Sequence, residues 1–250
     1  MNQTEFLPCA VIPVYNHTIR LKGVVDALAN AGLPVILVDD GSSTECRQFL
    51  EELDSGSANI SLKRHGQNQG KGAAVKTGLA TAAELGYSHA LQVDADGQHN
   101  LDDLPVFIET ARQNPQALIA GFPAYDDSVP GHRYYGRYLT HVWIWINTLS
   151  FEIVDSMCGF RVYPLAASNS LLGSCNTGDR MDFDSEFIVR WFWQGLPLQQ
   201  LATRVIYPEE GISHFRLFRD NVLISCMHAK LFFGMLLRLP RLLARKWNKS

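Results

Sequence analysis

Short apolar runs alternate with amphipathic stretches along the first half of the chain. The runs cover Phe6 to Val14, Pro34 to Val38, the residues before Asp94, and Ala117 to Gly121, and Asn59 to Arg64 is a further expected strand. Continuous apolar, β-branched runs such as Pro34 to Val38 are typical of parallel strands covered on both faces. We therefore predict a strand for each run.

The stretches between these runs carry the signals of helices. Apolar residues recur at helical spacing from Ile19 to Ala31, and Gly32 is placed to end that helix. Ser42 with Glu45 has the pattern of a capping box for the next helix. Further helices are expected from the glycine-rich turn to about Leu85 and from Leu101 to about Gln113. Alternating strands and helices predict an α/β fold with a doubly wound, mostly parallel sheet.

The pattern changes after Gly121. A polar, aromatic and basic loop is expected from Tyr125 to Tyr138, followed by an apolar helix from about Leu139 to Phe151. A compact segment, Asp155 to Pro164, comes next. The remaining expected elements are a helix from Asp182 to its stop at Gly195 and a late strand from Leu201 to Tyr207.

The C-terminal stretch from Asn221 to Ser250 has no acidic residue. Its basic residues recur at steps of three or four, so a helix would gather them into one stripe between apolar faces. Pro240 is expected to kink or split this helix, and charges interrupt its apolar run, so we do not expect it to span a membrane. The pattern fits a helix lying on an anionic membrane; the alternative is a terminal helix pair packed on the domain.

Composition limits the class of protein. The 250 residues are 46% hydrophobic, which is enough for one sizeable core, and we expect a domain over 1–215 and an amphipathic helical segment over 216–250. A net charge of −3 provides no broad basic field for nucleic acid. Five scattered cysteines without a Cys-x-x-Cys pair, and an N-terminus without a secretory signal, favour a reduced intracellular protein.

The best candidate chemistry is the acidic turn after the fourth predicted strand. Asp94 and Asp96 follow apolar Leu91 and Val93, which places both carboxylates at the carboxyl edge of the sheet, where open α/β sheets bind ligands. Mg²⁺ and Mn²⁺ prefer oxygen ligands, often one or two carboxylates plus substrate phosphates. The alternative is an ordinary acidic turn between strand and helix.

Two further turns extend this candidate site. Asp39 and Asp40 end the second predicted strand, so they can converge with Asp94 and Asp96 on one ligand, one pair facing a nucleoside and the other a metal and diphosphate. The glycine-rich turn from His65 to Ala74 lacks the spacing and the Ser or Thr of a P-loop. Its lysine, Lys71, remains available to a phosphate.

Five stretches together resemble the family 2 glycosyltransferases of GT-A fold, most of all their polyprenyl-phosphate mannosyltransferase and glucosyltransferase branch. The stretches, in the family's order, are Ile12 to Asn16, Val38 to Ser42, Asn68 to Gly72, Val93 to His99 and Cys158 to Tyr163. The resemblance covers roughly residues 6 to 210. It implies a Rossmann-like, mostly parallel sheet with helices on both faces.

The resemblance also implies roles for individual residues. The nucleotide-sugar would be held by Pro13, Tyr15, Asp39, Asp40, Lys71, Asp94 and Gln98. Asp94 and Asp96 would bind Mg²⁺ or Mn²⁺, with Asp96 the more direct ligand. The acceptor phosphate would be held by Arg133, Arg137 and Arg161, because guanidinium groups bind phosphates bidentately. His214 stands where the family tends to have a Ser-Lys pair and could do similar phosphate work; the alternative is a basic turn before a helix.

A general base is needed only if the acceptor is an alcohol. Glu186 is our first candidate and Asp184 the second; alternatively, both are first-turn carboxylates favoured by a helix dipole. With Asp96, Glu186 and Arg161 as catalytic residues, the implied reaction is displacement with inversion at the anomeric carbon. The implied place is the cytoplasmic membrane face.

Other functions remain as alternatives. The acceptor is a lipid in the first hypothesis, and a soluble alcohol or a growing glycan in the second. A third hypothesis is a nucleotide-sugar-binding protein without transferase activity. An NAD-dependent oxidoreductase is disfavoured, because Pro13 to Asn16 stands where a Gly-x-Gly-x-x-Gly turn would be needed.

Overall fold

A single mixed sheet forms the centre of the molecule. The computed structural model describes residues 5–124, 131–204 and 217–249, and within them seven strands occur in the order β3-β2-β1-β4-β6-β5-β7. Their bounds are β1 (Pro8–Val14), β2 (Val35–Asp39), β3 (Ile60–Arg64), β4 (His89–Gln92), β5 (Leu118–Pro123), β6 (Arg161–Pro164) and β7 (Leu198–Thr203).

Most strands of this sheet are parallel. β1 pairs in parallel with β2 and β4, and β2 with β3, so these four strands end at the same edge. β6 is antiparallel to both β4 and β5, whereas β7 is parallel to β5. The predicted mostly parallel α/β fold is confirmed, and the carboxyl edge of β1, β2 and β4 is a shared surface.

Helices cover both faces of the sheet. One face packs against α1 (Leu21–Asn30), α2 (Thr44–Ser55) and α4 (Leu104–Gln113), and the other against α3 (Lys71–Glu84), α6 (Leu165–Ser174) and α7 (Phe183–Gln194). Strand β1 shows why: Cys9 and Val11 enter the core with α3, whereas Ala10 and Ile12 enter the core with α1. All four side chains are completely buried, as the continuous apolar run predicted.

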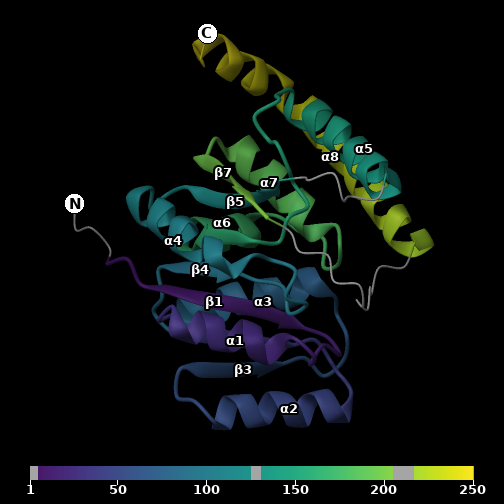
Figure 1. Cartoon of the computed structure of the whole chain (residues 1–250). Helices are drawn as coiled ribbons and strands as arrows, with labels where there is room; N and C mark the ends of the chain where they lie inside the picture. The colour runs from purple at the N-terminus through teal and green to yellow at the C-terminus, as the bar shows by residue number, and fades with distance from the viewer. Residues whose placement is uncertain (1–4, 125–130, 205–216, 250) are drawn as a thin grey trace.

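Two long helices lie side by side at the end of the molecule opposite β3. These are α5 (Gly131–Thr148) and α8 (Leu217–Lys249), shown in teal and yellow in Figure 1. Met227, Leu231, Met235 and Leu242 of α8 are buried in the core that includes α7. α8 is one helix that contains Pro240, so a split into a helix pair was wrong; packing of Met235 and Leu242 on either side supports the helix across the proline.

Several predicted boundaries differ from the structure. α5 already begins at Gly131, within the stretch expected to be a loop; residues 125–130 lie outside the described part. β7 begins at Leu198 instead of Leu201, and α6 was not predicted. The N-cap of α2 is Ser43, because the Ser42 hydroxyl accepts a hydrogen bond from the backbone N–H of Asn16 instead.

The approach of α3 to β1 depends on a glycine and provides a stability test. A Cβ on Gly78 would collide with Cγ1 of Val11 in the strand below. We expect Gly78→Ala to lower the free energy of unfolding by about 1–3 kcal/mol, as overpacking of a core does. The measurement is urea unfolding.

Gly23 on α1 is the matched control. Nothing lies within 4 Å of a Cβ placed there, so Gly23→Ala should leave stability unchanged or raise it by up to about 1 kcal/mol through helix propensity. Equal stability of the two variants would contradict the packing described here.

Candidate active site

The acidic turn after β4 lies against the start of α3. The Lys71 ammonium is 2.8 Å from Oδ1 and 2.9 Å from Oδ2 of Asp94. Nε2 of His99 is 3.3 Å from Oδ2 of the same carboxylate. Asp96 accepts a hydrogen bond from the backbone N–H of Gln98 at 3.0 Å, across a turn in which Gly97 has a φ of 66°. The structure thus brings together Lys71, Asp94, Asp96 and Gln98, four of the predicted site residues.

Asp184 belongs to the same cluster. Its Oδ2 lies 3.4 Å from the Lys71 ammonium, and its Oδ1 is 3.4 Å from the Gln92 amide nitrogen. The hydroxyl of Tyr163 in turn donates to the Gln92 side-chain oxygen at 2.8 Å. One ammonium therefore lies between two carboxylates, and we call Asp94, Lys71 and Asp184 the lysine-carboxylate triad.

Two members of the triad, Asp94 and Lys71, have strongly shifted pKa values. Burial raises the pKa of Asp94, but Lys71 and His99 outweigh it and hold that pKa well below the ordinary value. Burial lowers the pKa of Lys71, but Asp94 and Asp184 more than compensate and hold it above the ordinary value. Asp94 and Lys71 are therefore both charged at neutral pH.

The acidic turn has the donor atoms that a hard divalent cation accepts. Oδ1 of Asp94 and both ring nitrogens of His99 are buried without a partner in hydrogen-bonding geometry. Among the described residues, no group of three or more His, Cys, Asp or Glu side chains is arranged around a metal position. Mg²⁺ and Mn²⁺ commonly use one or two carboxylates and take their other ligands from water and substrate phosphates. Asp94 and Asp96 fit that type of incomplete site.

The second acidic turn is tied into the fold. Asp39 is completely buried; it accepts a hydrogen bond from the Ser42 backbone N–H at 2.8 Å and pairs with Nε of Arg64 at 3.0 Å. Pro13 and Tyr15 lie beside this turn, at the end of β1, where Pro13 pairs with Val38. The predicted nucleoside contacts of these residues stay predictions.

Asp40 organises the loop that leads to α3. Its carboxylate is 2.8 Å from Nδ1 of His65 and accepts from the Asn68 amide at 2.9 Å and from the backbone N–H groups of Gln69 and Gly70 at 2.8 Å. Lys71 follows Gly70 directly. Asp40 thus fixes the backbone that carries Lys71 toward Asp94, which connects the two acidic turns.

Arg161 does not have the position that we predicted. Its side chain is completely buried, and its three nitrogens donate to the backbone carbonyls of Cys158, Ser156 and Asp184 at 2.7–2.8 Å. Because every guanidinium nitrogen serves the protein backbone, this geometry contradicts a direct contact with an acceptor phosphate. Arg161 instead fixes the loop before β6 against α7.

The other predicted acceptor residues are only partly described. Nε of Arg137 donates to Asp155 at 2.6 Å, and Asp155 also accepts from the backbone N–H groups of Met157 and Cys158. The side chain of Arg133 and the whole of His214 lie outside the described residues. The acceptor contacts predicted for Arg133, Arg137 and His214 stay predictions.

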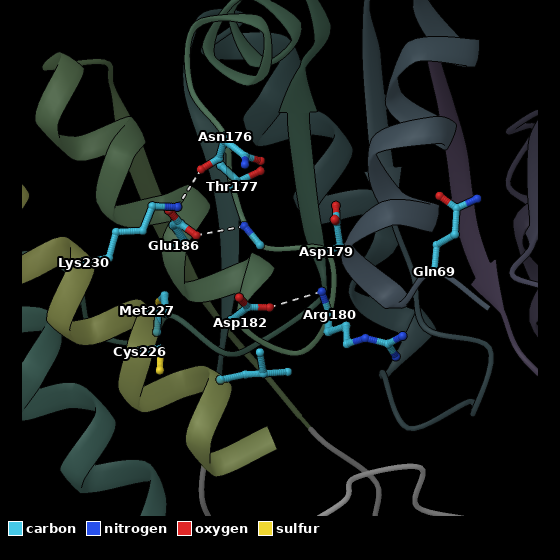
Figure 2. Close-up of a pocket in the computed structure, with 12 residues that line it drawn as sticks. Gln69, Asn176, Thr177, Asp179, Arg180, Asp182, Glu186, Cys226, Met227 and Lys230 are labelled. Carbon is cyan, nitrogen blue, oxygen red and sulfur yellow. Dashed lines mark hydrogen bonds and ion pairs between the residues drawn. The ribbon is translucent and has the colours of Figure 1, made fainter. Parts of the chain in front are cut away.

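Glu186 faces a different pocket. Its carboxylate accepts from Arg190 at 2.6 Å and from the Gly178 backbone N–H at 2.9 Å, and pairs with Lys230 of α8 at 2.9 Å. Figure 2 shows Glu186 and Lys230 at a cavity of about 410 Å³ between α7, α8 and the loop before α7. Asp184 lies beside Lys71 and the acidic turn, whereas Glu186 faces the cavity beside α8, so Asp184 is the better candidate for a role in the reaction.

Sequence reasoning missed two residues of the acidic turn's surroundings. His99 ends the Val93 to His99 motif and stacks on Phe160 with ring centroids 5.2 Å apart. Gly159 lies over the triad, since a Cβ there would be 2.9 Å from both Asp94 Oδ2 and the Lys71 ammonium. Both residues lie in stretches that carry the family resemblance, Val93 to His99 and Cys158 to Tyr163, and this was the sequence signal that could have identified them.

Comparison with known proteins decides the family. The model of the family described as Glycosyl transferase family 2 matches residues 9–167, which run from the second residue of β1 past the end of β6 and include both acidic turns. The chain belongs to glycosyl transferase family 2. It is a glycosyltransferase, and the predicted family is confirmed.

The names of two relatives of this family 2 glycosyltransferase include a lipid phosphate, dolichyl phosphate. The UDP-N-acetylglucosamine–dolichyl-phosphate N-acetylglucosaminyltransferase of Methanococcus voltae is 28% identical over 244 residues, covering 91% of this chain and 94% of the relative. The dolichyl-phosphate β-glucosyltransferase of Dictyostelium discoideum is 25% identical over 215 residues, covering 77% of this chain and 64% of the relative.

Solved structures show the same fold. Glucosyl-3-phosphoglycerate synthase of Mycobacterium tuberculosis superposes with a TM-score of 0.64 at 15% identity, over 93% of this chain and 79% of that one. Staphylococcus aureus TarS 1-349 in complex with UDP-GlcNAc gives 0.61 at 15% identity, over 92% and 71%. The GT-A fold expected from the sequence is confirmed.

Gly159 allows a test of the geometry of this glycosyltransferase. The Cβ of Gly159→Ala would displace the ends of Asp94 and Lys71, which are side-chain tips able to move. Because misplacement of catalytic groups by about 1 Å costs on the order of a hundredfold in rate, we expect kcat/KM to fall about 10- to 100-fold with little change in the melting temperature. The measurement is sugar transfer alongside thermal unfolding.

Gly173→Ala is the control, since nothing lies within 4 Å of a Cβ at that position of α6. Its kcat/KM should equal that of the wild type. An unchanged kcat/KM in Gly159→Ala would show that the close approach above Asp94 is not needed.

Proposed function

We propose that this glycosyltransferase transfers a sugar from a UDP-sugar to a polyprenyl phosphate, with a divalent metal at Asp94 and Asp96. The observation that carries the proposal is the convergence of Asp94, Lys71 and Asp184 at the carboxyl edge of the sheet. The match to nearly the full length of the M. voltae enzyme, whose name includes both UDP-N-acetylglucosamine and dolichyl phosphate, supports this pair of substrates.

The residues suggest how the donor is held. Asp94 and Asp96 bind Mg²⁺ or Mn²⁺, which when bound stabilises the charge of the departing diphosphate. Lys71 provides a second cation within reach of the same phosphates. Asp39, Asp40 and Tyr15 lie at the neighbouring strand ends, where the nucleoside would extend.

The chemistry is a direct displacement with inversion. A phosphate acceptor is ionised at neutral pH, so its oxygen can attack the anomeric carbon without a general base. Asp184, next to Lys71, then has an electrostatic role, whereas an alcohol acceptor would require Asp184 as the base. Because a polyprenyl phosphate needs no general base, Glu186 is not required as a base and can serve as an ion-pair partner of α8.

α8 supplies a surface for a lipid acceptor. Phe218, Phe233, Leu237 and Trp247 have 66–86% of their surface exposed, and the helix has no acidic residue after Asp220. Within the described residues, Phe218–Trp247 is long and apolar enough to cross a membrane, and 22% of its most apolar window is buried. Basic and apolar side chains together favour an anionic membrane surface.

The packing of α8 favours a helix that lies on the membrane. Met227 and Leu242 are both buried against the domain and are separated by about 22 Å along the helix, at 1.5 Å per residue. A helix that packs against the domain over that length cannot cross the bilayer unless the domain enters the bilayer as well. We therefore propose peripheral association with the cytoplasmic face, where the nucleotide-sugar is available.

The test of this function is transfer of labelled sugar from a UDP-sugar to a short polyprenyl phosphate. We expect chelation of divalent metal to abolish transfer and Mn²⁺ or Mg²⁺ to restore it. Asp96→Ala should reduce kcat at least about 100-fold, because the charge developing on the diphosphate loses its metal. Asp102→Ala is the control: Asp102 is an exposed carboxylate in the next turn and should leave kcat unchanged.

Two outcomes would contradict the proposal. Transfer of the sugar to water-soluble acceptors, without any transfer to polyprenyl phosphate, would mean that the acceptor is an alcohol or a glycan. UDP-sugar binding that survives Asp96→Ala, without turnover by the wild type on any acceptor, would favour a binding protein.

Membrane association has its own test. The double substitution Phe233→Glu with Leu237→Glu places two charges on the exposed face of α8, so sedimentation with anionic phospholipid vesicles should fall at least about tenfold. Val106→Glu, which changes an exposed residue of α4, should bind vesicles like the wild type. Loss of binding in both variants, or in neither, would rule out this face of α8 as the contact.

A further inference from the structure

We infer that Lys71 is an internal counter-ion that occupies the carboxylates of the empty donor site, so that metal binding depends on the nucleotide. The inference rests on the proposed function, because it assigns how that site loads. In the donor-free enzyme Lys71 pairs with both Asp94 and Asp184. When the diphosphate arrives, the ammonium moves to the phosphate oxygens and leaves Asp94 to the metal.

The position of Lys71 is consistent with a fixed backbone and a movable tip. The backbone is held by Gly70, whose φ is 115°, and by the Ala73 N–H, which donates to the Asp179 carbonyl at 2.9 Å. A Cβ on Gly72 would collide with Phe183, so α3 and α7 are in close contact here. The ammonium, by contrast, is bound only by the side chains of Asp94 and Asp184, among the contacts that the structure describes.

The carboxylate of Asp94 has fewer hydrogen bonds than that of Asp40, the structural carboxylate of the neighbouring turn. Asp40 has four partners, two of them backbone N–H groups, and its side chain is 3% exposed. The Asp94 side chain is 23% exposed, and its described partners are Lys71 and His99, with Oδ1 outside hydrogen-bonding geometry. A partly buried ion pair with few further hydrogen bonds adds little stability, which argues that the pair exists for another purpose.

Lys71 and a metal compete for the same oxygens. A divalent cation bound to Asp94 would lie within a few ångströms of the ammonium, and the two positive charges would repel each other. A diphosphate removes the conflict, because its oxygens bind both an ammonium and a metal. Metal alone should therefore bind weakly, and metal with nucleotide strongly.

The test is a pair of affinities measured on the folded protein without turnover. Free Mn²⁺ is followed by electron paramagnetic resonance in the absence of nucleotide, and UDP binding by calorimetry without metal. In Lys71→Met we expect Mn²⁺ alone to bind about tenfold more tightly and UDP about tenfold more weakly, because one positive charge has been removed. A merely structural role would weaken both affinities together.

Lys76 provides the matched control. It lies on the same helix and pairs with Asp179 at 2.7 Å and with the Thr177 carbonyl at 3.0 Å, away from Asp94. Lys76→Met removes the same charge nearby and should change neither affinity. A general electrostatic effect of any lysine in α3 would shift both variants equally and would overturn the assignment to Lys71.

Wild-type protein gives an independent measurement if Lys71→Met does not fold. Mn²⁺ alone should raise its melting temperature little, whereas Mn²⁺ with UDP should raise it clearly. Equal stabilisation with and without UDP would overturn the inference. If the wild type binds neither UDP nor Mn²⁺ with UDP, the proposed function fails instead, so the two failures are distinguishable.

Discussion

The contact of Lys71 with Asp94 and Asp184 joins three parts of the chain that are far apart in sequence. It connects the start of α3, the turn after β4 and the start of α7. Small residues make this approach possible: Gly72 lies against Phe183, and Gly159 lies over the triad. A larger side chain at Gly72 would push α3 away from α7, and one at Gly159 would displace the tips of Asp94 and Lys71, so the ion pairs depend on the packing at both glycines.

A second set of interactions holds that contact in place. Asp40 binds the loop before Lys71, and Arg161 binds the loop before β6 to the first turn of α7 through buried carbonyls. Asp40 and Arg161 thus fix the positions of the loops that form the site. On the far side of α7, Glu186 pairs with Lys230, so the helix that presents Asp184 to the donor site also anchors α8.

The sequence predicts the fold well where the signal is local. Strands buried on both faces are continuous apolar runs, so β1, β2, β4, β5 and the acidic turns could be placed. Arg161 was assigned to phosphate because its residue type binds phosphate, but its burial depends on the antiparallel insertion of β6, which no local pattern encodes. Asp184 and Glu186 are two residues apart, roughly 200° around a helix, so choosing between them requires knowing which face of α7 meets β4.

The most direct test of the account is to locate the metal. Crystals grown with Mn²⁺ and UDP, with data collected at the manganese absorption edge, should give an anomalous peak within about 2.5 Å of Asp96 and the diphosphate oxygens, with Asp94 alongside and the Lys71 ammonium turned to phosphate. A peak at Glu186 in the cavity beside α8, or UDP bound away from both acidic turns, would contradict the site described here.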